Sequence, residues 1–118
     1  MGKPTKMIPL LTQAQYENLI RRNNPKVPEN KVYNPRVGIA FGAEWCGPCR
    51  RLDKDAIADA TPEVQWYYCD IDENDYTPGY CGIRGVPAFV MILDGVFQSN
   101  KLVGPGSVQQ VVTWSKSM

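Results

Sequence analysis

Two cysteines three positions apart, between a predicted strand and a predicted helix, are the feature that most restricts how this chain can fold. Residues 37–41 form a short apolar run rich in β-forming side chains, and residues 50–58 have a helical pattern. Cys46 and Cys49 therefore lie at a strand-to-helix junction, where unpaired backbone N–H groups and the helix dipole favour a thiolate. We expect Cys46, nearer the helix start, to be the more exposed and more acidic thiol. Cys49, one helical turn further in, suits a resolving role.

A zinc site is the alternative use of such a cysteine pair. Its second half would be Cys69 and Cys81, but eleven residues separate these two and the chain has no histidine. A metal site is therefore not expected, and a purely structural disulfide in so short a loop would constrain little unfolded-state entropy. The strand pattern predicts a buried Cys69. Cys81, at the end of a weak helix, is predicted to be exposed and open to regulatory oxidation.

Length and composition predict a single domain over residues 1–118, with a flexible N-terminus at residues 1–5 and an extended loop at residues 23–35. The 118 residues are 43% hydrophobic, enough for a core without disulfide staples. No apolar run approaches the roughly 20 residues of a membrane span. Residues 1–36 hold seven basic and two acidic side chains, but the absence of interleaved aromatics argues against nucleic acid.

The remaining pattern predicts alternating strands and helices. Edge-strand signals at residues 6–11 precede a helix over residues 13–22, for which Thr12 and Gln15 form a capping box. Further predicted elements are a strand over residues 64–72, a weak helix over 74–80, strands over 86–93 and 96–103 joined by a turn at Asp94 and Gly95, and a helix capped by Ser107. This order implies a central mixed sheet flanked by helices.

Two motifs resemble thioredoxin. Residues 43–49, Ala-Glu-Trp-Cys-Gly-Pro-Cys, are similar to the family's active-site segment, and residues 85–87, Gly-Val-Pro, to its cis-proline loop. The resemblance extends in order over residues 5–117. It implies a three-layer α/β/α thioredoxin-like fold with a mixed sheet, a cis Val86–Pro87 bond facing the cysteines, and a thiol:disulfide oxidoreductase that reduces protein disulfides through a Cys46 mixed disulfide.

The resemblance also implies supporting roles around the cysteine pair. Trp45 would shield the thiolate, and Pro87 would face the sulfurs. Gly47 and Pro48, between the two cysteines, would favour a reducing role for the pair, as in the reducing members of the family. The predicted substrate-docking residues are Ile83, Val86 and Gly104, although each could equally be an ordinary turn or surface residue. The implied partners are protein disulfides and a thioredoxin reductase or similar donor. No cofactor is expected beyond the Cys46–Cys49 disulfide, and a cytoplasmic monomer is expected.

Departures from the family pattern are as informative as the matches. The buried aspartate six residues before the first cysteine is Ala40 here, its accompanying lysine is Tyr68, and the kinking proline of the active-site helix is Lys54. Because both buried charges are absent together, neither is left unpaired. Help in deprotonating Cys49 would then come from water, Tyr68 or Glu44, or from no group.

A second class of function stays open from the sequence. These departures and the long loop over residues 23–35 also fit a thioredoxin-like binding module, an accessory subunit whose thiols are secondary.

Overall fold

The structure of the protein is a computed structural model that describes residues 5–20 and 35–118. The predicted flexible N-terminus and the predicted loop at residues 23–35 lie almost entirely outside these ranges.

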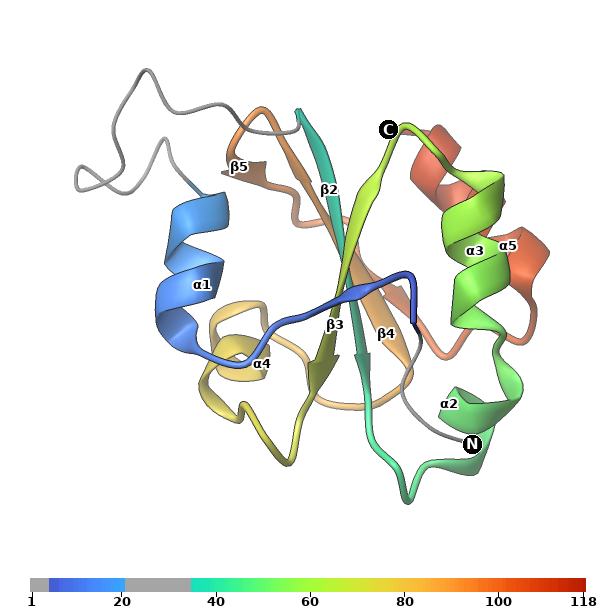
Figure 1. Ribbon diagram of the computed structural model, residues 1–118, viewed down its shortest axis with the longest axis horizontal. Coiled ribbons are helices and arrows are strands. Elements are labelled where there is room, and N and C mark those ends of the chain that lie inside the picture. Colours follow the sequence, from blue (N-terminus) through green and yellow to red (C-terminus); the bar gives the residue numbers. More distant parts are fainter. Residues whose placement is uncertain (1–4, 21–34) are drawn as a thin grey trace.

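A six-stranded mixed sheet runs through the centre of the molecule (Figure 1). Its path is β1-β3-β2-β4-β5, and β6 also pairs with β4. β1 and β2 run parallel to β3, whereas β4 is antiparallel to β2, β5 and β6. The strands are β1 (Ile8–Pro9), β2 (Arg36–Gly42), β3 (Gln65–Asp70), β4 (Ala88–Leu93), β5 (Val96–Phe97) and β6 (Leu102–Val103). The thioredoxin-like mixed sheet expected from the sequence is confirmed.

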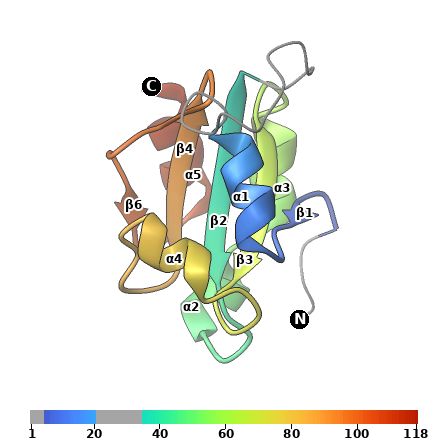
Figure 2. The ribbon, with the colours of Figure 1, turned by 90° about the vertical axis from the view of Figure 1, so that its left-hand side faces the viewer.

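Helices cover both faces of the sheet, giving three layers. α1 and α4 lie on one face and α3 and α5 on the other, and the quarter turn of Figure 2 brings α1 and α4 in front of the sheet. The short α2 lies at the end of the sheet where β2 and β3 finish. The helices are α1 (Gln13–Leu19), α2 (Gly47–Arg51), α3 (Lys54–Ala60), α4 (Tyr76–Tyr80) and α5 (Val108–Lys116).

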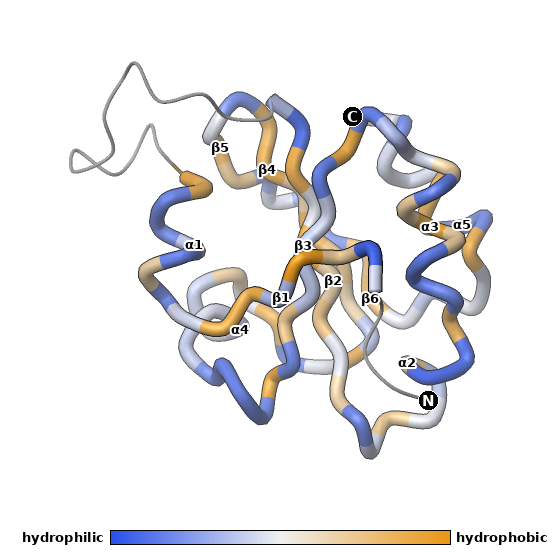
Figure 3. Tube along the Cα trace, in the orientation of Figure 1, coloured by the Kyte–Doolittle hydropathy of each residue, from blue (hydrophilic) through white to orange (hydrophobic). Residues whose placement is uncertain are grey.

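Each face of the sheet has its own hydrophobic cluster. On one side Ile39, Phe41 and Val90 pack with α1 residues such as Tyr16; on the other, Trp66 and Phe89 meet edge to face with ring centres 6.0 Å apart. Figure 3 shows hydrophobic residues along β1 and β4 and hydrophilic ones on α2. The near-continuous apolar runs of β2 and β4 follow from burial on both faces.

The helix starts and the tight turn agree with the sequence. The Thr12 hydroxyl accepts a hydrogen bond from the Gln15 backbone N–H at 3.2 Å, and the Gln15 side chain closes the capping box. Ser107 caps α5 in the same way. Asp94 and Gly95 both have positive φ, 52° and 78°, as the tight hairpin turn requires.

The predicted continuous helix at residues 50–58 is wrong, because the chain breaks it into α2 and α3. Leu52 ends α2 in an extended conformation, and the Asp53 carboxylate accepts the Ala56 N–H at 3.0 Å as the N-cap of α3. An aspartate favours such a cap over a helix interior. A kink is therefore present without a proline, and Lys54 becomes the first residue of α3.

The predicted strand over residues 96–103 is also divided. Ile92 pairs with Phe97, but Ala88 pairs with Val103, two residues further than a continuous ladder would give. The two extra residues lie between β5 and β6. The second arm of the hairpin therefore bulges.

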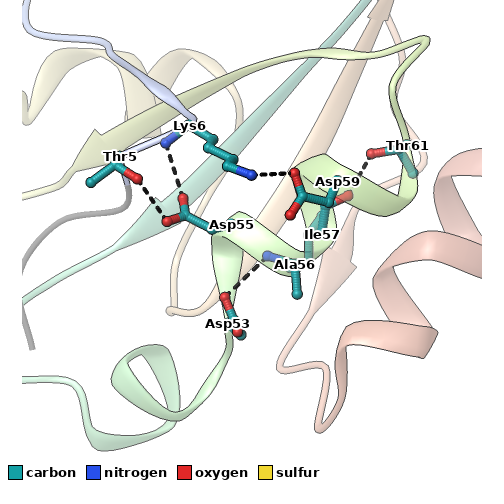
Figure 4. A network of polar contacts seen from close by, with 8 residues as sticks. All are labelled: Thr5, Lys6, Asp53, Asp55, Ala56, Ile57, Asp59 and Thr61. Carbon is teal, nitrogen blue, oxygen red and sulfur yellow. Dashed lines mark hydrogen bonds and ion pairs between the residues drawn. The ribbon is translucent and has the colours of Figure 1, made fainter.

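Polar contacts attach the segment before β1 to α3 (Figure 4). Asp55 accepts hydrogen bonds from the Lys6 backbone N–H at 3.0 Å and the Thr5 hydroxyl at 2.8 Å, and Lys6 forms an ion pair with Asp59 at 2.6 Å. The bonds from Lys6 and Thr5 lower the pKa of Asp55 below 3.8. This carboxylate therefore stabilises the fold above its unfolded-state pKa, and the contribution is lost as the pH falls through the lower folded-state pKa.

We expect Asp55→Asn to lower the free energy of unfolding at neutral pH by less than about 1 kcal/mol, because the contacts are exposed. The difference from the unsubstituted protein should disappear in acid, where Asp55 is protonated in both states. Denaturant titrations at neutral pH and at a pH below the folded-state pKa of Asp55 measure both values. A difference independent of pH would assign the effect to packing instead.

Candidate active site

The cysteine pair lies where β2 ends and α2 begins, as predicted. A tight turn makes the junction: the Cys46 N–H donates to the Ala43 carbonyl at 3.1 Å, and the Arg50 guanidinium donates to the Glu44 carbonyl at 2.7 Å. Cys46 is the N-cap of α2, and Pro48 occupies its first turn, where a missing N–H costs nothing. The sulfur of Cys46 thus faces the free backbone N–H groups of the helix start.

Cys46 and Cys49 form a disulfide, with Cα atoms 5.2 Å apart. The Cys49 backbone N–H donates to the Cys46 sulfur at 3.2 Å. That donor would stabilise a thiolate at Cys46 in the reduced state, because hydrogen bonds to the charged form lower a thiol pKa.

Cys46 is the more accessible sulfur of the pair, but only slightly. The two residues are 5% and 1% exposed, so the open, exposed thiol suggested by the sequence is in fact a shallowly covered one. Ala43 and the half-buried Ile71 and Val86 pack around the pair. Attack on a substrate must therefore occur at the small accessible surface of Cys46, which we refer to as the opening.

Trp45 stands beside this opening and is 64% exposed. Its indole N–H donates to the Asp72 carboxylate at 2.9 Å, and this bond holds the ring against the loop that follows β3. Sequence reasoning did not single out Asp72. The signal available was its place at the end of the buried strand predicted over residues 64–72, at the same sheet edge as the cysteines.

The loop before β4 faces the cysteines. The Val86–Pro87 bond is cis, and the Val86 carbonyl oxygen lies 3.7 Å from the Cys46 sulfur. The Gly104 N–H donates to the Pro87 carbonyl at 2.8 Å, and Gly104 has a φ of 65°, which favours glycine. The second predicted motif and the glycine loop therefore meet at one edge of the site.

The predicted docking residues do not all share one environment. Val86 packs against the cysteines, and Gly104 is exposed beside Pro87. Gly47 is half-buried and Pro48 is exposed at the start of α2. Ile83 is half-buried and packs mainly against the cluster under α1 and α4.

Beneath the pair, the structure places the three departures from the family pattern together. Ala40 is fully buried and pairs with Tyr68 across β2 and β3. Lys54 is 8% exposed, and its ammonium donates to the Cys49 carbonyl at 2.6 Å. Burial raises the pKa of Tyr68 to about 12, so the phenol keeps its proton near neutrality. Glu44, the other base considered, is exposed.

Of the remaining cysteines, Cys69 is fully buried, as predicted. The prediction that Cys81 is exposed is wrong, since only 2% of it is accessible. It packs under α1 beside Tyr16, and Lys101 bonds its carbonyl at 3.4 Å. Burial raises the thiol pKa values of Cys69 and Cys81 to about 12 and 11, which makes both poor nucleophiles and removes the basis for oxidative regulation at Cys81.

Over residues 5–20 and 35–118, no three acidic, cysteine or histidine side chains lie close enough to hold a metal ion. In the same ranges, no helix has the length and apolar character needed to cross a membrane.

Comparison with known proteins gives a consistent result. The family model described as Thioredoxin matches residues 10–117. Thioredoxin-3, mitochondrial, of Saccharomyces cerevisiae is 30% identical over 77% of this chain and 65% of its own length, and the thioredoxin of Pseudomonas aeruginosa is 35% identical over 66% and 74%. Thioredoxin M2, chloroplastic, of Arabidopsis thaliana is 34% identical over 58% of this chain, which spans only 38% of that protein.

A solved structure with the same fold is the oxidised form of mitochondrial thioredoxin 3 from Saccharomyces cerevisiae. It superimposes with a TM-score of 0.78 at 26% identity and covers 97% of both chains.

Proposed function

The chain belongs to the thioredoxin family, and from that premise we propose that it is a thiol:disulfide oxidoreductase that reduces protein disulfides. The observation that carries the proposal is the Cys46–Cys49 disulfide at the start of α2, beside the cis Val86–Pro87 bond. Such a pair exchanges two electrons with a substrate while the backbone around it stays in place.

The first step is attack by the Cys46 thiolate on a substrate disulfide. A Cys46–substrate disulfide forms, and the other substrate sulfur leaves as a thiolate that takes a proton from solvent. The 3.2 Å bond from the Cys49 N–H to the Cys46 sulfur favours the attacking thiolate.

In the second step the Cys49 thiolate attacks the Cys46 sulfur. The Cys46–Cys49 disulfide forms and the second substrate thiolate is released, so the protein loses two electrons and the substrate gains them. A dithiol donor, which the family resemblance suggests is a reductase, returns the pair to the reduced state. In the disulfide form the Cys46 sulfur lies 3.7 Å from the Val86 carbonyl oxygen.

Substrate docking is proposed at the rim of the opening. The exposed Trp45 ring, held by Asp72, provides contact area, and the backbone of Val86 offers hydrogen-bonding groups to an extended segment that adds as a strand. Gly104 is exposed at this rim, and its N–H donates to the Pro87 carbonyl. Ile83 is a peripheral contact in this arrangement because it packs mainly inward.

We further propose that the protein acts as a monomer in a reducing compartment, the cytoplasm. The free thiols of Cys69 and Cys81 support this location, because unpaired cysteines suit a reducing environment.

Catalysed reduction of insulin by dithiothreitol tests the proposal. Catalytic amounts of the protein should speed insulin reduction well above the rate with dithiothreitol alone. A binding module with secondary thiols would leave the rate at that of the reagent, and this result would overturn the proposal.

The order of the two steps is tested by Cys49→Ser. Without the resolving thiol, the Cys46–substrate disulfide should accumulate to about one equivalent per protein, because the second step cannot occur. Peptide mapping by mass spectrometry identifies the linked cysteine. Linkage through Cys69 or Cys81 would contradict the assignment of Cys46.

A further inference from the structure

The position at which the family pattern has a buried aspartate is Ala40 in this chain, so this residue offers no carboxylate to accept the proton of the resolving thiol. Ala40 supplies only a methyl group there, and its neighbour Tyr68 has a phenol that stays protonated near neutrality. The second step of the proposed function, on which this inference rests, nevertheless needs a thiolate at Cys49. Some other group must favour that thiolate.

Lys54 provides a positive charge next to the Cys49 backbone. The break after α2 makes Lys54 the first residue of α3 and directs its side chain under the cysteine pair, where it is 8% exposed. Its ammonium donates to the Cys49 carbonyl at 2.6 Å and lies 5.6 Å from the centre of the Tyr68 ring. Among the described residues no carboxylate forms an ion pair with it.

The Tyr68 hydroxyl borders the resolving sulfur from another side. A Cβ atom added at Gly42 would lie 2.9 Å from this hydroxyl and 3.5 Å from the Cys49 sulfur. The Tyr68 hydroxyl and the Cys49 sulfur therefore both border the small space that Gly42 leaves open at the end of β2. A phenol in this position is a hydrogen-bond donor to a thiolate.

We infer that Lys54 is a positioning residue that stabilises the Cys49 thiolate by its charge, assisted by the Tyr68 hydroxyl, and so replaces a buried general base. The Cys49 proton passes to solvent and Lys54 keeps its own throughout the step. A nearby opposite charge favours the ionised form of a thiol and so lowers its pKa. In this proposal the Cys49 thiolate is stabilised by a nearby positive charge, and no buried base accepts its proton.

The surrounding charges are compatible with this role. Burial lowers the pKa of Lys54, and the neighbouring carboxylate of Asp53 opposes that change and favours the ammonium form. On the Tyr68 side, burial, Asp70, Cys69 and Glu44 all raise the pKa of the phenol and keep it a donor.

The experiment titrates Cys49 alone. In a Cys46→Ser background, the ultraviolet absorbance of the thiolate is followed over about pH 6 to 9, around the ordinary thiol pKa of about 8.5. Cys69 and Cys81, with pKa values of about 12 and 11, stay protonated there. Lys54→Met should raise the pKa of Cys49 by about one unit, Lys54→Arg should raise it less, and Tyr68→Phe should produce a smaller rise.

Lys6→Met is the matched control, because Lys6 bonds the opposite side of α3 at Asp59 and its loss changes the net charge equally. An unchanged Cys49 pKa in folded Lys54→Met, or an equal rise in Lys6→Met, would overturn the inference. If Lys54→Met does not fold, an unchanged pKa in Lys54→Gln or, failing that, in Tyr68→Phe has the same force.

A kinetic measurement separates this inference from the proposed function. With both cysteines present, Lys54→Met should resolve the mixed disulfide about threefold more slowly at neutral pH, because a tenfold loss of thiolate is partly offset by its greater nucleophilicity. The order of the two rates should reverse in alkali, where Cys49 ionises in both proteins and the more basic thiolate of Lys54→Met is the stronger nucleophile. The titration uses no substrate, so it can fail while the unsubstituted protein still reduces disulfides, and the reverse also holds. Equal rates at neutral pH would contradict the role of Lys54.

Discussion

Replacing Cys46 with serine is expected to reduce catalysed insulin reduction to the rate of dithiothreitol alone. The Cys46 sulfur is the one at the opening, it accepts the Cys49 N–H at 3.2 Å, and no other thiol in the described chain can take its place. Cys49 is 1% exposed against 5% for Cys46, so it is the less accessible of the two thiols to a protein disulfide. Cys46→Ser therefore cannot carry out the first step, the attack on the substrate disulfide.

The matched controls are Cys69→Ala and Cys81→Ala, which remove the buried thiols. Both should keep most of the activity and lose only the stability that a small core substitution costs. Residual turnover in Cys46→Ser that disappears when Cys81 is also replaced would show that a second nucleophile operates.

The largest expected loss of stability comes from Gly38→Ala. Gly38 lies opposite Trp66 in the register of β2 and β3, and a Cβ atom there would enter the indole ring. The ring cannot easily retreat, because its N–H donates to the Thr61 hydroxyl at 2.8 Å and its face receives Phe89. Overpacking of this kind costs about 1–3 kcal/mol or somewhat more. Guanidinium titration at constant m-value measures it.

Gly79→Ala is the control for the glycine change, because no atom lies within 4 Å of a Cβ built there. It should be neutral or slightly stabilising in α4. Combining Gly38→Ala with Trp66→Leu should cost less than the two changes added, since the smaller side chain makes room. Additive losses would show that the two residues do not compete for space.

Local chemistry explains what the sequence predicted well. A capping box at Thr12 and Gln15 and a turn at Asp94 and Gly95 depend on residues close in the chain, so both appear where expected. The strand-to-helix junction at Cys46 is equally local. The family motifs then supplied the long-range partner of the cysteines, the loop at Pro87.

What the sequence did not predict depends on contacts between distant elements. Cys81 lies at the end of a weak helix, a position that predicts an exposed side chain, but α1 packs over it through Tyr16. The role of Lys54 was missed because a regular helical pattern over residues 50–58 hides the break at which Asp53 caps a new helix. Only the folded chain shows that this break sends an ammonium group under Cys49.

In the proposed reaction, the two electrons leave the protein through Cys46 and Cys49 together. One equivalent of fully reduced protein is mixed with excess insulin, the reaction is quenched by alkylation, and the labelled cysteines are mapped by mass spectrometry. We predict one Cys46–Cys49 disulfide formed for each insulin disulfide lost, with Cys69 and Cys81 remaining thiols. Insulin that stays oxidised, or is reduced while Cys46 and Cys49 remain thiols, would contradict the claim.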